Sequence, residues 1–424
     1  MTARTKGVGP ILAVNFAGSL GFTIVMPFLV FLVTQWGGDA IVYGLVSAAY
    51  SAFQLVGAPL LGRWSDVVGR KRVLAVSQAG SALSWLVALA AFHLPLITLA
   101  EVDSRLLGSF TLTLPLVGLF VARALDGLTG GNVSVANAYV ADISPPAERD
   151  ANFGKLSASA NVGEVLGPAL AGLLVGTALG YQLPVVVAAA VSFGATLLIV
   201  LRLPDSKPAG ETSASTAPSA LDVCGGRKYK RAASTAMKAR DLLRLPRVAL
   251  LLSASFLVNL AFNIFNITLP VWAVKELNWT PGKMGMFFAV MSLAMVVVEG
   301  PGLRRLSRVC SDSVLIGLGS LVLGLGFLAL TSHATPVVFT GAILIAVGNG
   351  LMWPLIVALL SDKAGQHQGA VQGLAGSTGA VAAIIGLLLG GLLYAPLQGW
   401  LFVLSAAMIF VVGITALWSR RQTA

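Results

Sequence analysis

Residues 62–74, GRWSDVVGRKRVL, join two apolar runs, 42–61 and 73–95. Glycines and basic residues are common in a tight turn at a membrane surface, where Lys and Arg anchor the helix ends. Asp66 does not fit that explanation, because an acid among several bases at a helix end indicates a specific ion pair. The stretch therefore predicts two successive membrane helices joined by a short charged loop.

The rest of the chain repeats this alternation of long apolar runs and short charged segments. Of its 424 residues, 56% are hydrophobic and only 11% are charged, whereas a soluble domain carries roughly 25% charged residues. About 20 apolar residues in a helix cross a hydrocarbon core of about 30 Å. We predict an all-α membrane protein with twelve transmembrane helices, at about 10–34, 42–61, 73–95, 114–141, 153–177, 184–202, 248–274, 284–302, 313–331, 337–361, 370–394 and 400–418.

The net charge of +11 does not indicate a nucleic-acid partner. Twelve spans place both termini on one side of the bilayer, and most of the 28 Lys and Arg fall on that side. This asymmetry is the positive-inside bias, so we expect a multi-pass protein of the plasma or inner membrane with both termini cytoplasmic. Cys224 and Cys310 also fall on that side and are expected to be free thiols.

A polar segment divides the chain into two halves. Residues 203–247 include PDSKPAGETSASTAPSA and a basic run, a composition typical of a linker. We predict six-helix bundles over 1–202 and 248–424, joined by a cytoplasmic linker over 203–247. Aligning the halves matches Pro59, Arg63 and Ser65 with Pro301, Arg305 and Ser307, and Gly154, Gly167 and Gly172 with Gly373, Gly386 and Gly391. Two pseudo-symmetric repeats are a transporter architecture, with the substrate site between them near mid-membrane.

The charged loop after the second span carries the first family resemblance. Its pattern G-x-x-x-D-x-x-G-R-K resembles the signature of the major facilitator superfamily between spans 2 and 3. The resemblance implies a cytoplasmic gate that closes when the halves meet, formed here by Gly62, Asp66, Gly69, Arg70, Asp142 and Arg149. The equivalent loop of the second half, GLRRLSRVCSD, has Arg308 in place of the acid, so the gate is expected to be asymmetric.

The fourth span contains two charged residues, Arg123 and Asp126. Charges within a membrane are costly unless paired, and residues three apart on a helix can neutralise each other. One interpretation is therefore a structural ion pair; the other is that Arg123 tunes a titrating acid in a proton path. The stretches RALDGLTGGN and ADISPPAER closely resemble twelve-span drug–proton antiporters, including tetracycline-resistance efflux pumps. In that family the arginine is linked to proton transfer, so the resemblance favours the second interpretation.

The fifth span contains a spaced set of small residues. Gly154, Gly163, Gly167, Pro168 and Gly172 resemble the antiporter signature G-x8-G-x3-GP-x2-GG, although Ala171 replaces one glycine. Glycines let helices approach closely, and proline removes a backbone hydrogen bond. In the family this motif is associated with antiporters and forms a pliable helix at the interface between the halves.

Glu164 lies within this motif, although the motif does not require an acid there. Counting the helical rise places Asp126 about 6 Å and Arg123 about 10 Å beyond it on the neighbouring span. A buried carboxylate suits proton carriage, and a structural partnership with Arg123 is the alternative. Exporters of this type often carry an acid in the first span where this chain has Gly18. Proton coupling is therefore predicted to use Glu164, Asp126 and Arg123.

Polar stripes on several spans predict a substrate cavity, since the family lines its cavity chiefly with spans 1, 4, 7 and 10. Any one stripe is also explained by hydrogen bonds between helices. No histidine lies in a span core, so neither a metal site nor a tetracycline–metal substrate is predicted. Glu299, near the inner end of the eighth span, is expected to snorkel or to belong to a gate. The predicted cavity residues are Asn15, Thr23, Tyr50, Gln54, Asn259, Asn263, Asn266, Asn349 and Trp353.

These features predict a secondary active transporter that exports a small organic or drug-like compound in exchange for protons, by alternating access. A uniporter, or a proton symporter that imports a small metabolite, is the alternative, and a membrane receptor without transport is more remote. An enzyme is not predicted, because the spans hold no catalytic constellation and the chain has no GxxxxGK[ST] loop. We expect a monomer in the lipid bilayer without a cofactor or metal, whose partners are a small-molecule substrate and protons.

Overall fold

The computed structural model describes residues 8–104, 108–130, 132–145, 148–205, 247–364 and 368–421. Most of the predicted linker, and Cys224, lie outside the described residues. In the described part, eleven helical spans are long and apolar enough to cross a membrane. A shorter apolar helix, α11 (Pro281–Val297), is continued by the π-helical segment η3 (Val298–Gly302) and by α12 (Leu303–Leu306). The prediction of a helical, multi-span fold is confirmed.

The helices form two groups along the chain. In the N-terminal half, the first and fourth spans are each divided into two helices. This half contains α1 (Val8–Thr23), α2 (Met26–Gln35), α3 (Ala40–Val68), α4 (Arg70–Ala91), α5 (Leu114–Thr129), α6 (Asn132–Ile143), α7 (Arg149–Val175) and α8 (Gln182–Arg202). Besides α11, η3 and α12, the C-terminal half contains α10 (Val248–Lys275), α13 (Asp312–Ala329), α14 (Thr335–Ala364), α15 (Gln368–Leu392), α16 (Tyr394–Leu397) and α17 (Trp400–Arg421).

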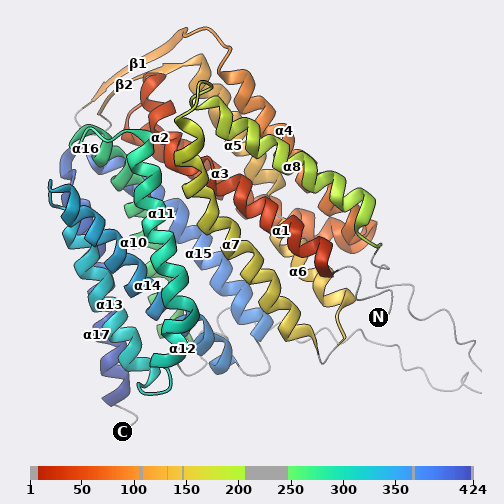
Figure 1. Cartoon of the computed structure of the whole chain (residues 1–424), viewed down its shortest axis with the longest axis vertical. Helices are drawn as coiled ribbons and strands as arrows, with labels where there is room; N and C mark the ends of the chain where they lie inside the picture. Colours follow the sequence, from red (N-terminus) through yellow and green to blue (C-terminus); the bar gives the residue numbers. More distant parts are fainter. Residues whose placement is uncertain are drawn as a thin grey trace, which may run out of the picture.

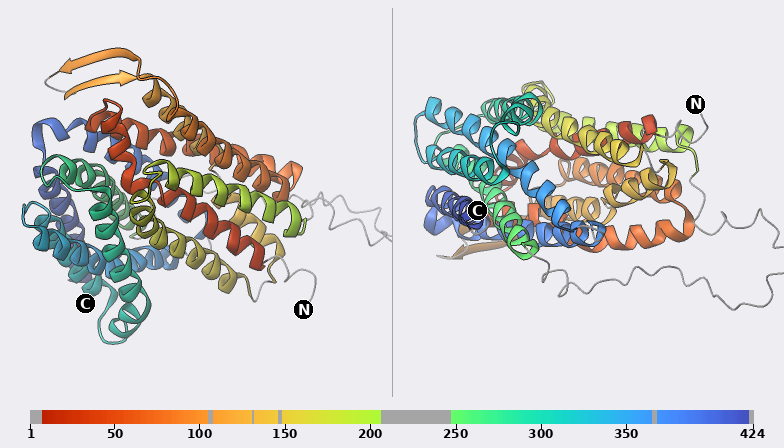
Figure 2. Two further views of the ribbon diagram at one scale, coloured as in Figure 1. Left: turned by 45° about the horizontal axis from the view of Figure 1, so that its top comes forward. Right: turned by 90° about the horizontal axis from the view of Figure 1, so that it is seen from below.

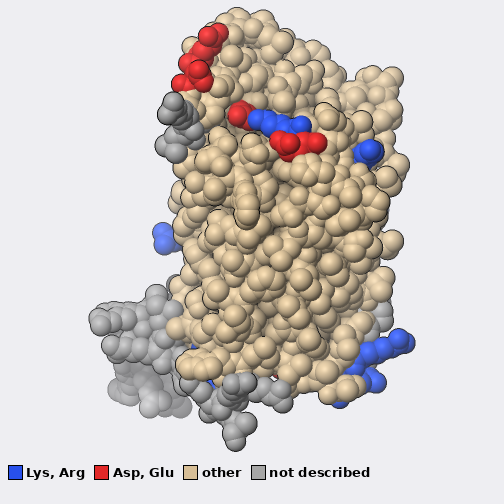
Figure 3. Space-filling model, turned by 90° about the vertical axis from the view of Figure 1, so that its left-hand side faces the viewer, with Lys and Arg blue, Asp and Glu red and all other residues tan. Residues whose placement is uncertain are grey.

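The two halves lie side by side, with both chain termini towards one end of the molecule (Figure 1). We call this the termini end, and we call the opposite end, where a small β-hairpin projects beyond the helices, the hairpin end (Figure 2). On the face drawn in Figure 3, the charged side chains gather towards the two ends and the broad band between them is nearly free of charge. Such a band is what a bilayer requires of the surface that contacts lipid.

The hairpin is an addition to the helical fold. Strands β1 (Thr98–Ser104) and β2 (Gly108–Thr113) pair antiparallel between α4 and α5. The backbone N–H of Thr111 donates to the carbonyl of Gly37 at 2.8 Å, and the hydroxyl of Thr113 donates to the carbonyl of Trp36 at 2.7 Å. These bonds attach β2 to the turn that joins α2 and α3. No strand is predicted there from the sequence, because the segment is short and follows an apolar helix.

The halves contact each other closely at the hairpin end. A Cβ atom added to Gly172 of α7 would lie 2.8 Å from the Cα of Gly285 of α11, and one added to Gly391 of α15 would lie 2.7 Å from the carbonyl oxygen of Ala40 of α3. Gly391 also lies against Gly44 of α3. Because Gly172 and Gly391 are equivalent positions of the sequence repeat, the two halves use the same kind of backbone contact twice.

The halves part towards the termini end. A cavity of about 790 Å³, the termini-end cavity, opens there between α3, α6 and α15 and is lined by Gln54, Pro59, Asn137, Gly373 and Ser377, among others. A Cβ atom added to Gly62, Gly154 or Gly373 would meet nothing within 4 Å. The conformation is therefore closed at the hairpin end and open at the termini end.

Candidate functional site

Arg123 and Asp126 form an ion pair in the interior of the N-terminal half. Both are on α5, with 1% and 4% of their surfaces exposed, and Nη1 of Arg123 lies 3.5 Å from Oδ2 of Asp126. The pairing predicted from their spacing is confirmed. Side chains at Gly57 of α3 and Gly127 of α5 would overlap the backbone of the opposite helix. This close packing of α3 on α5 brings Tyr50 against Arg123.

Two aromatic rings hold the guanidinium of Arg123. Its Cζ lies 5.2 Å from the ring centroid of Phe22 and 4.7 Å from that of Tyr50, and the two rings are 4.5 Å apart. A guanidinium over aromatic faces is attracted by their π electrons, more strongly when water is excluded. In the described part of the chain, Nε and Nη2 of Arg123 have no hydrogen-bond partner. The side chain is thus fixed in position while two of its donors stay unused.

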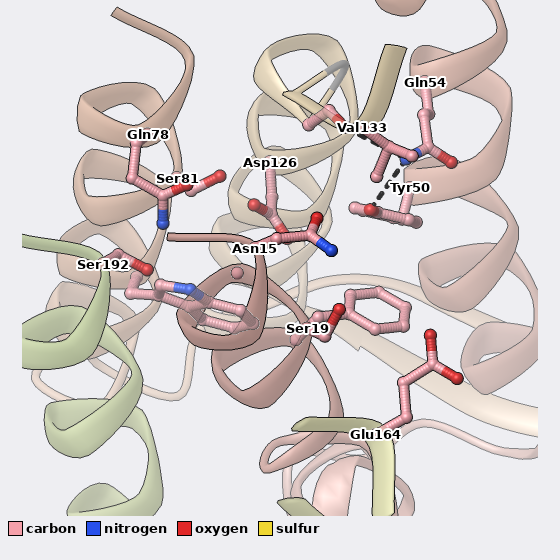
Figure 4. A pocket seen from close by; sticks show the side chains of 14 residues that line it. Asn15, Ser19, Tyr50, Gln54, Gln78, Ser81, Asp126, Val133, Glu164 and Ser192 are labelled. Carbon is pink, nitrogen blue, oxygen red and sulfur yellow. Dashed lines mark hydrogen bonds between the residues drawn. The ribbon is translucent and has the colours of Figure 1, made fainter. Parts of the chain in front are cut away.

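A polar cavity of about 240 Å³ lies within the N-terminal half, and we call it the acid cavity. Both Asp126 of α5 and Glu164 of α7 line it. Figure 4 shows the two acids extending from different helices, with Asn15 and Ser19 of α1 between them. One cavity therefore connects two carboxyl groups that the sequence separates.

A second cavity of about 260 Å³, the interface cavity, lies where the two halves meet. From the N-terminal half it is lined by Thr23, Tyr43 and Arg123, and from α10 of the C-terminal half by Asn263 and Asn266, among others. Phe22 and Tyr50 line both this cavity and the acid cavity. Phe22 and Tyr50 therefore form a wall between the two cavities. The carboxyl groups of Asp126 and Glu164 line the acid cavity, and Arg123 lines the interface cavity.

Glu164 is exposed to the acid cavity rather than paired with Arg123. The described residues contain four ion pairs, and Glu164 belongs to none of them. The alternative of a structural Arg123–Glu164 pair is therefore not what the structure shows. Glu164 is thus an exposed residue of α7 that lines the acid cavity.

Six of the nine predicted cavity residues line the two central cavities. Asn15, Tyr50 and Gln54 line the acid cavity, and Thr23, Tyr50, Asn263 and Asn266 line the interface cavity. Asn259, Asn349 and Trp353 line neither. The amide of Asn259 donates instead to the carbonyl of Ser255 on its own helix at 2.8 Å, and Asn349 is buried.

The acid cavity has a wall that the sequence reasoning missed. Gln78, Ser81 and Trp85 of α4 and Ser192 of α8 line it, although these helices are not among the spans expected to face the centre. The sequence SQAGSALS at 77–84 contains the signal, because its polar residues recur on one face of an otherwise apolar helix. Polar side chains within a membrane helix are costly unless they are paired or face a cavity, and Gln78 and Ser81 face this one.

The predicted gate residues form an ion-pair cluster at the termini end. Arg70 contacts Asp66 at 2.6 Å and Asp142 of α6 at 3.2 Å, and its Nη1 donates to the hydroxyl of Ser65 at 2.5 Å. Gly69, between α3 and α4, has φ 101°, a conformation that strongly favours glycine. These contacts all lie within the N-terminal half, so the role of the cluster in closing the halves stays a prediction.

Two further predicted gate residues lie beside this cluster. Gly62 accepts a hydrogen bond from the hydroxyl of Ser65 through its carbonyl at 2.6 Å, and Arg149 donates to the carbonyl of Ala141 at 3.1 Å. Arg149 therefore joins the start of α7 to the end of α6. Together these bonds connect α3, α4, α6 and α7 at the termini end.

The motif glycines of the fifth span differ in what they contact. Gly163 and Gly167 pack against the backbone or side chains of α1, and Gly172 packs against α11 of the other half. Gly154 faces open space. Pro168 lies inside α7, which continues through it to Val175. The motif therefore places α7 against both its own half and the opposite one.

A further ion pair, not predicted from the sequence, joins the halves at the hairpin end. Nζ of Lys275, at the end of α10, lies 2.5 Å from Oδ1 of Asp39. The same oxygen of Asp39 accepts the backbone N–H of Ala40 at 2.7 Å and caps α3. Lys275 also lies over the ring of Tyr394 at 5.6 Å. We call the Asp39–Lys275 pair the latch.

Removal of the latch is expected to loosen the hairpin end slightly. The side chain of Lys275 is 43% exposed, and exposed ion pairs contribute about 0–1 kcal/mol. Lys275→Gln should therefore raise the population open at the hairpin end by at most about fivefold. The measurement is labelling of a Ser51→Cys probe in the interface cavity by an impermeant maleimide, in a Cys224→Ser/Cys310→Ser background. A labelling rate for Lys275→Gln that exceeds that of the exposed control Lys283→Gln by much more than about fivefold would contradict the assignment.

In the described residues, no group of three or more His, Cys, Asp or Glu side chains is placed to hold a metal ion. Cys310 is free and partly buried. The polar groups gathered at the centre of the molecule are therefore one guanidinium, two carboxyls, and amides and hydroxyls.

Comparison with known proteins gives consistent matches over nearly the whole chain. The model of the Major Facilitator Superfamily matches residues 11–386 and 251–424. The tetracycline resistance protein, class E, of Escherichia coli is 27% identical over 94% of this chain and 92% of its own length. The class C protein of the same species is 29% identical over 95% of each chain. Among solved structures, a D-xylose–proton symporter has a TM-score of 0.72 at 14% identity, covering 97% of this chain and 96% of that one.

Proposed function

Because the chain belongs to the Major Facilitator Superfamily, whose members are membrane transporters rather than enzymes, we propose that it exports a small organic or drug-like compound in exchange for protons. The observation that carries this proposal is the acid cavity, in which Asp126 and Glu164 share one polar space beside the interface between the halves. The similarity to tetracycline resistance proteins supports drug-like cargo. Which compound is carried differs among such relatives, so the cargo is proposed only as a class.

The charge asymmetry of the sequence supports an orientation in the membrane. We assign the termini end to the cytoplasm of a cell that carries the protein as a monomer in its plasma or inner membrane. The conformation is then inward-open, since the termini-end cavity faces the cytoplasm. Cargo enters between the halves from that side and reaches the interface cavity beneath the closed hairpin end.

The proposed cycle uses Glu164 as the site where the proton is exchanged. With the termini end open, Glu164 is in contact with the cytoplasm and can release a proton there as cargo binds. Parting of the contacts at Gly172 and Gly391 then exposes the cavity to the outside, while Arg70, Asp66 and Asp142 stabilise the closed termini end. A proton taken up from outside returns the halves to the inward-open state. Asp126, neutralised by Arg123, is the second acid of the path, reached through the acid cavity.

The exchange role of Glu164 is tested by Glu164→Gln, which keeps the size of the side chain and removes its titration. Proton movement driven by cargo is expected to fall at least tenfold, while cargo binding remains, because the interface cavity is unchanged. The measurement is dye-reported proton flux in inverted vesicles, with a resistance and transport panel used to choose the cargo.

The matched control is Glu148→Gln, an exposed acid just before the same helix, which should leave the flux unchanged. Wild-type flux from Glu164→Gln would show that this carboxyl does not exchange the proton. Cargo and protons moving in the same direction would instead support the alternative of a symporter that imports a metabolite. Specific binding without any flux would support the receptor.

A further inference from the structure

The buried guanidinium of Arg123 has an unoccupied side. Its Nη1 is directed to Asp126, whereas Nε and Nη2 have no hydrogen-bond partner in the described part of the chain. Arg123 is only 1% exposed, and yet it lines the interface cavity. Leaving buried donors without acceptors is unfavourable, and more so when the donors are charged. Such an arrangement indicates a ligand that supplies the missing acceptors.

The two unused donors have a specific geometry. Nε and Nη2 share one edge of the planar guanidinium, and this edge binds a carboxylate through two parallel hydrogen bonds. Stacking on Phe22 and Tyr50 prevents the group from turning, and Asp126 holds the opposite edge. The fork is therefore preorganised, so little entropy is lost when an acceptor binds.

The surroundings of this fork match an organic acid rather than an inorganic anion. Apolar side chains line the same cavity from both halves, including Met26, Ile267, Phe288 and Leu387. The amide-bearing residues Asn263 and Asn266 line it from α10. A volume of about 260 Å³ accommodates one or two rings with a polar substituent.

We propose that Arg123 binds the carboxylate of the cargo through Nε and Nη2, so that the protein carries small amphipathic organic acids whose apolar body occupies the interface cavity. This inference rests on the proposed transport function, and it gives Arg123 a role in binding in addition to its pairing with Asp126. Because the fork belongs to the N-terminal half and the amides to the C-terminal half, one bound acid contacts both halves.

The test compares acids with their neutral amides on the purified full-length protein. The probes are benzoate and benzamide, 1-naphthoate and 1-naphthamide, and indole-3-acetate and indole-3-acetamide, measured by calorimetric titration. Each pair has the same shape and differs in the charged fork acceptor. For the wild type, at least one acid should bind ten times more tightly than its amide. Arg123→Lys, which keeps the charge but not the fork, should lose most of this preference, and Arg123→Gln should lose all of it.

The control is Arg202→Gln, which removes one positive charge at the exposed end of α8 and should keep the wild-type preference. Thermal unfolding confirms that each variant is folded, and Arg123→Lys remains informative if Arg123→Gln is not. Equal binding of acids and amides, no binding of any acid, or an acid preference that survives in folded Arg123→Gln would each overturn the proposal. Proton flux driven by a neutral cargo, without acid binding, would refute the acid site and leave transport standing. Acid binding without proton flux would support the acid site and refute the proposed proton-coupled transport.

Discussion

Gly172→Val is expected to abolish transport by preventing the hairpin end from closing. A Cβ atom at this position would already lie 2.8 Å from the Cα of Gly285, and the obstacle is backbone, which cannot move aside as a flexible side chain can. The two branches of valine increase the overlap. The chain should still fold, since the overlap lies between α7 and α11, which belong to different halves. Transport in vesicles should fall to background, while Ser51→Cys becomes labelled from the hairpin side in most molecules.

The matched control lies on the same helix. Gly154 belongs to the same motif, but a Cβ atom there meets nothing within 4 Å. Gly154→Val should therefore leave the hairpin end closed and the Ser51→Cys probe protected, as in the wild type. Normal transport by Gly172→Val, or equal probe labelling in the two variants, would show that the α7–α11 contact does not control closure.

Asp126→Leu is expected to destabilise the protein more than any other single change to the central charges. The guanidinium of Arg123 would remain 1% exposed without its counter-ion. Breaking a buried ion pair by removing one partner costs about 3–5 kcal/mol, and a guanidinium cannot shed its charge. Thermal unfolding in detergent should show a large fall in the melting temperature.

The reverse change should cost less. In Arg123→Leu the remaining carboxyl can become neutral by binding a proton, which removes the buried charge. The double variant Arg123→Leu/Asp126→Leu should recover much of the stability lost in Asp126→Leu, because replacing a whole buried pair by apolar side chains is often neutral. A melting temperature of Asp126→Leu equal to that of the wild type, or no recovery in the double variant, would contradict the assignment.

The features that the sequence predicted well depend on local spacing. Arg123 and Asp126 share a helix face because they are three residues apart. Gly69, between α3 and α4, has a positive φ that favours glycine, and the turn lies within the same short stretch of sequence. The helical spans themselves follow from apolar length, which the bilayer imposes on each segment separately.

The features that the sequence could not predict depend on how distant helices are placed. The latch joins residues 236 positions apart, and nothing local to Asp39 or Lys275 marks them as partners. Asn259 looked like a cavity residue by its spacing with Asn263, yet only Asn263 lines the interface cavity, although both amides donate to carbonyls of their own helix. The acid cavity is lined partly by α4 and α8. These helices were not predicted to line it, because the family resemblance assigns the cavity chiefly to spans 1, 4, 7 and 10.

The glycine contacts at the hairpin end also bear on the speed of the cycle. Where Gly172 meets Gly285 and Gly391 meets Gly44, backbone lies against backbone with no side chains interleaved. Ordering a side chain at such a contact would cost up to about 2 kcal/mol of rotamer entropy on every closure, and glycine has no rotamers to lose. When the halves separate, no side chains have to leave pockets on the opposite helix at these contacts. The interface can thus be tight in its closed form and still have a low kinetic barrier to opening.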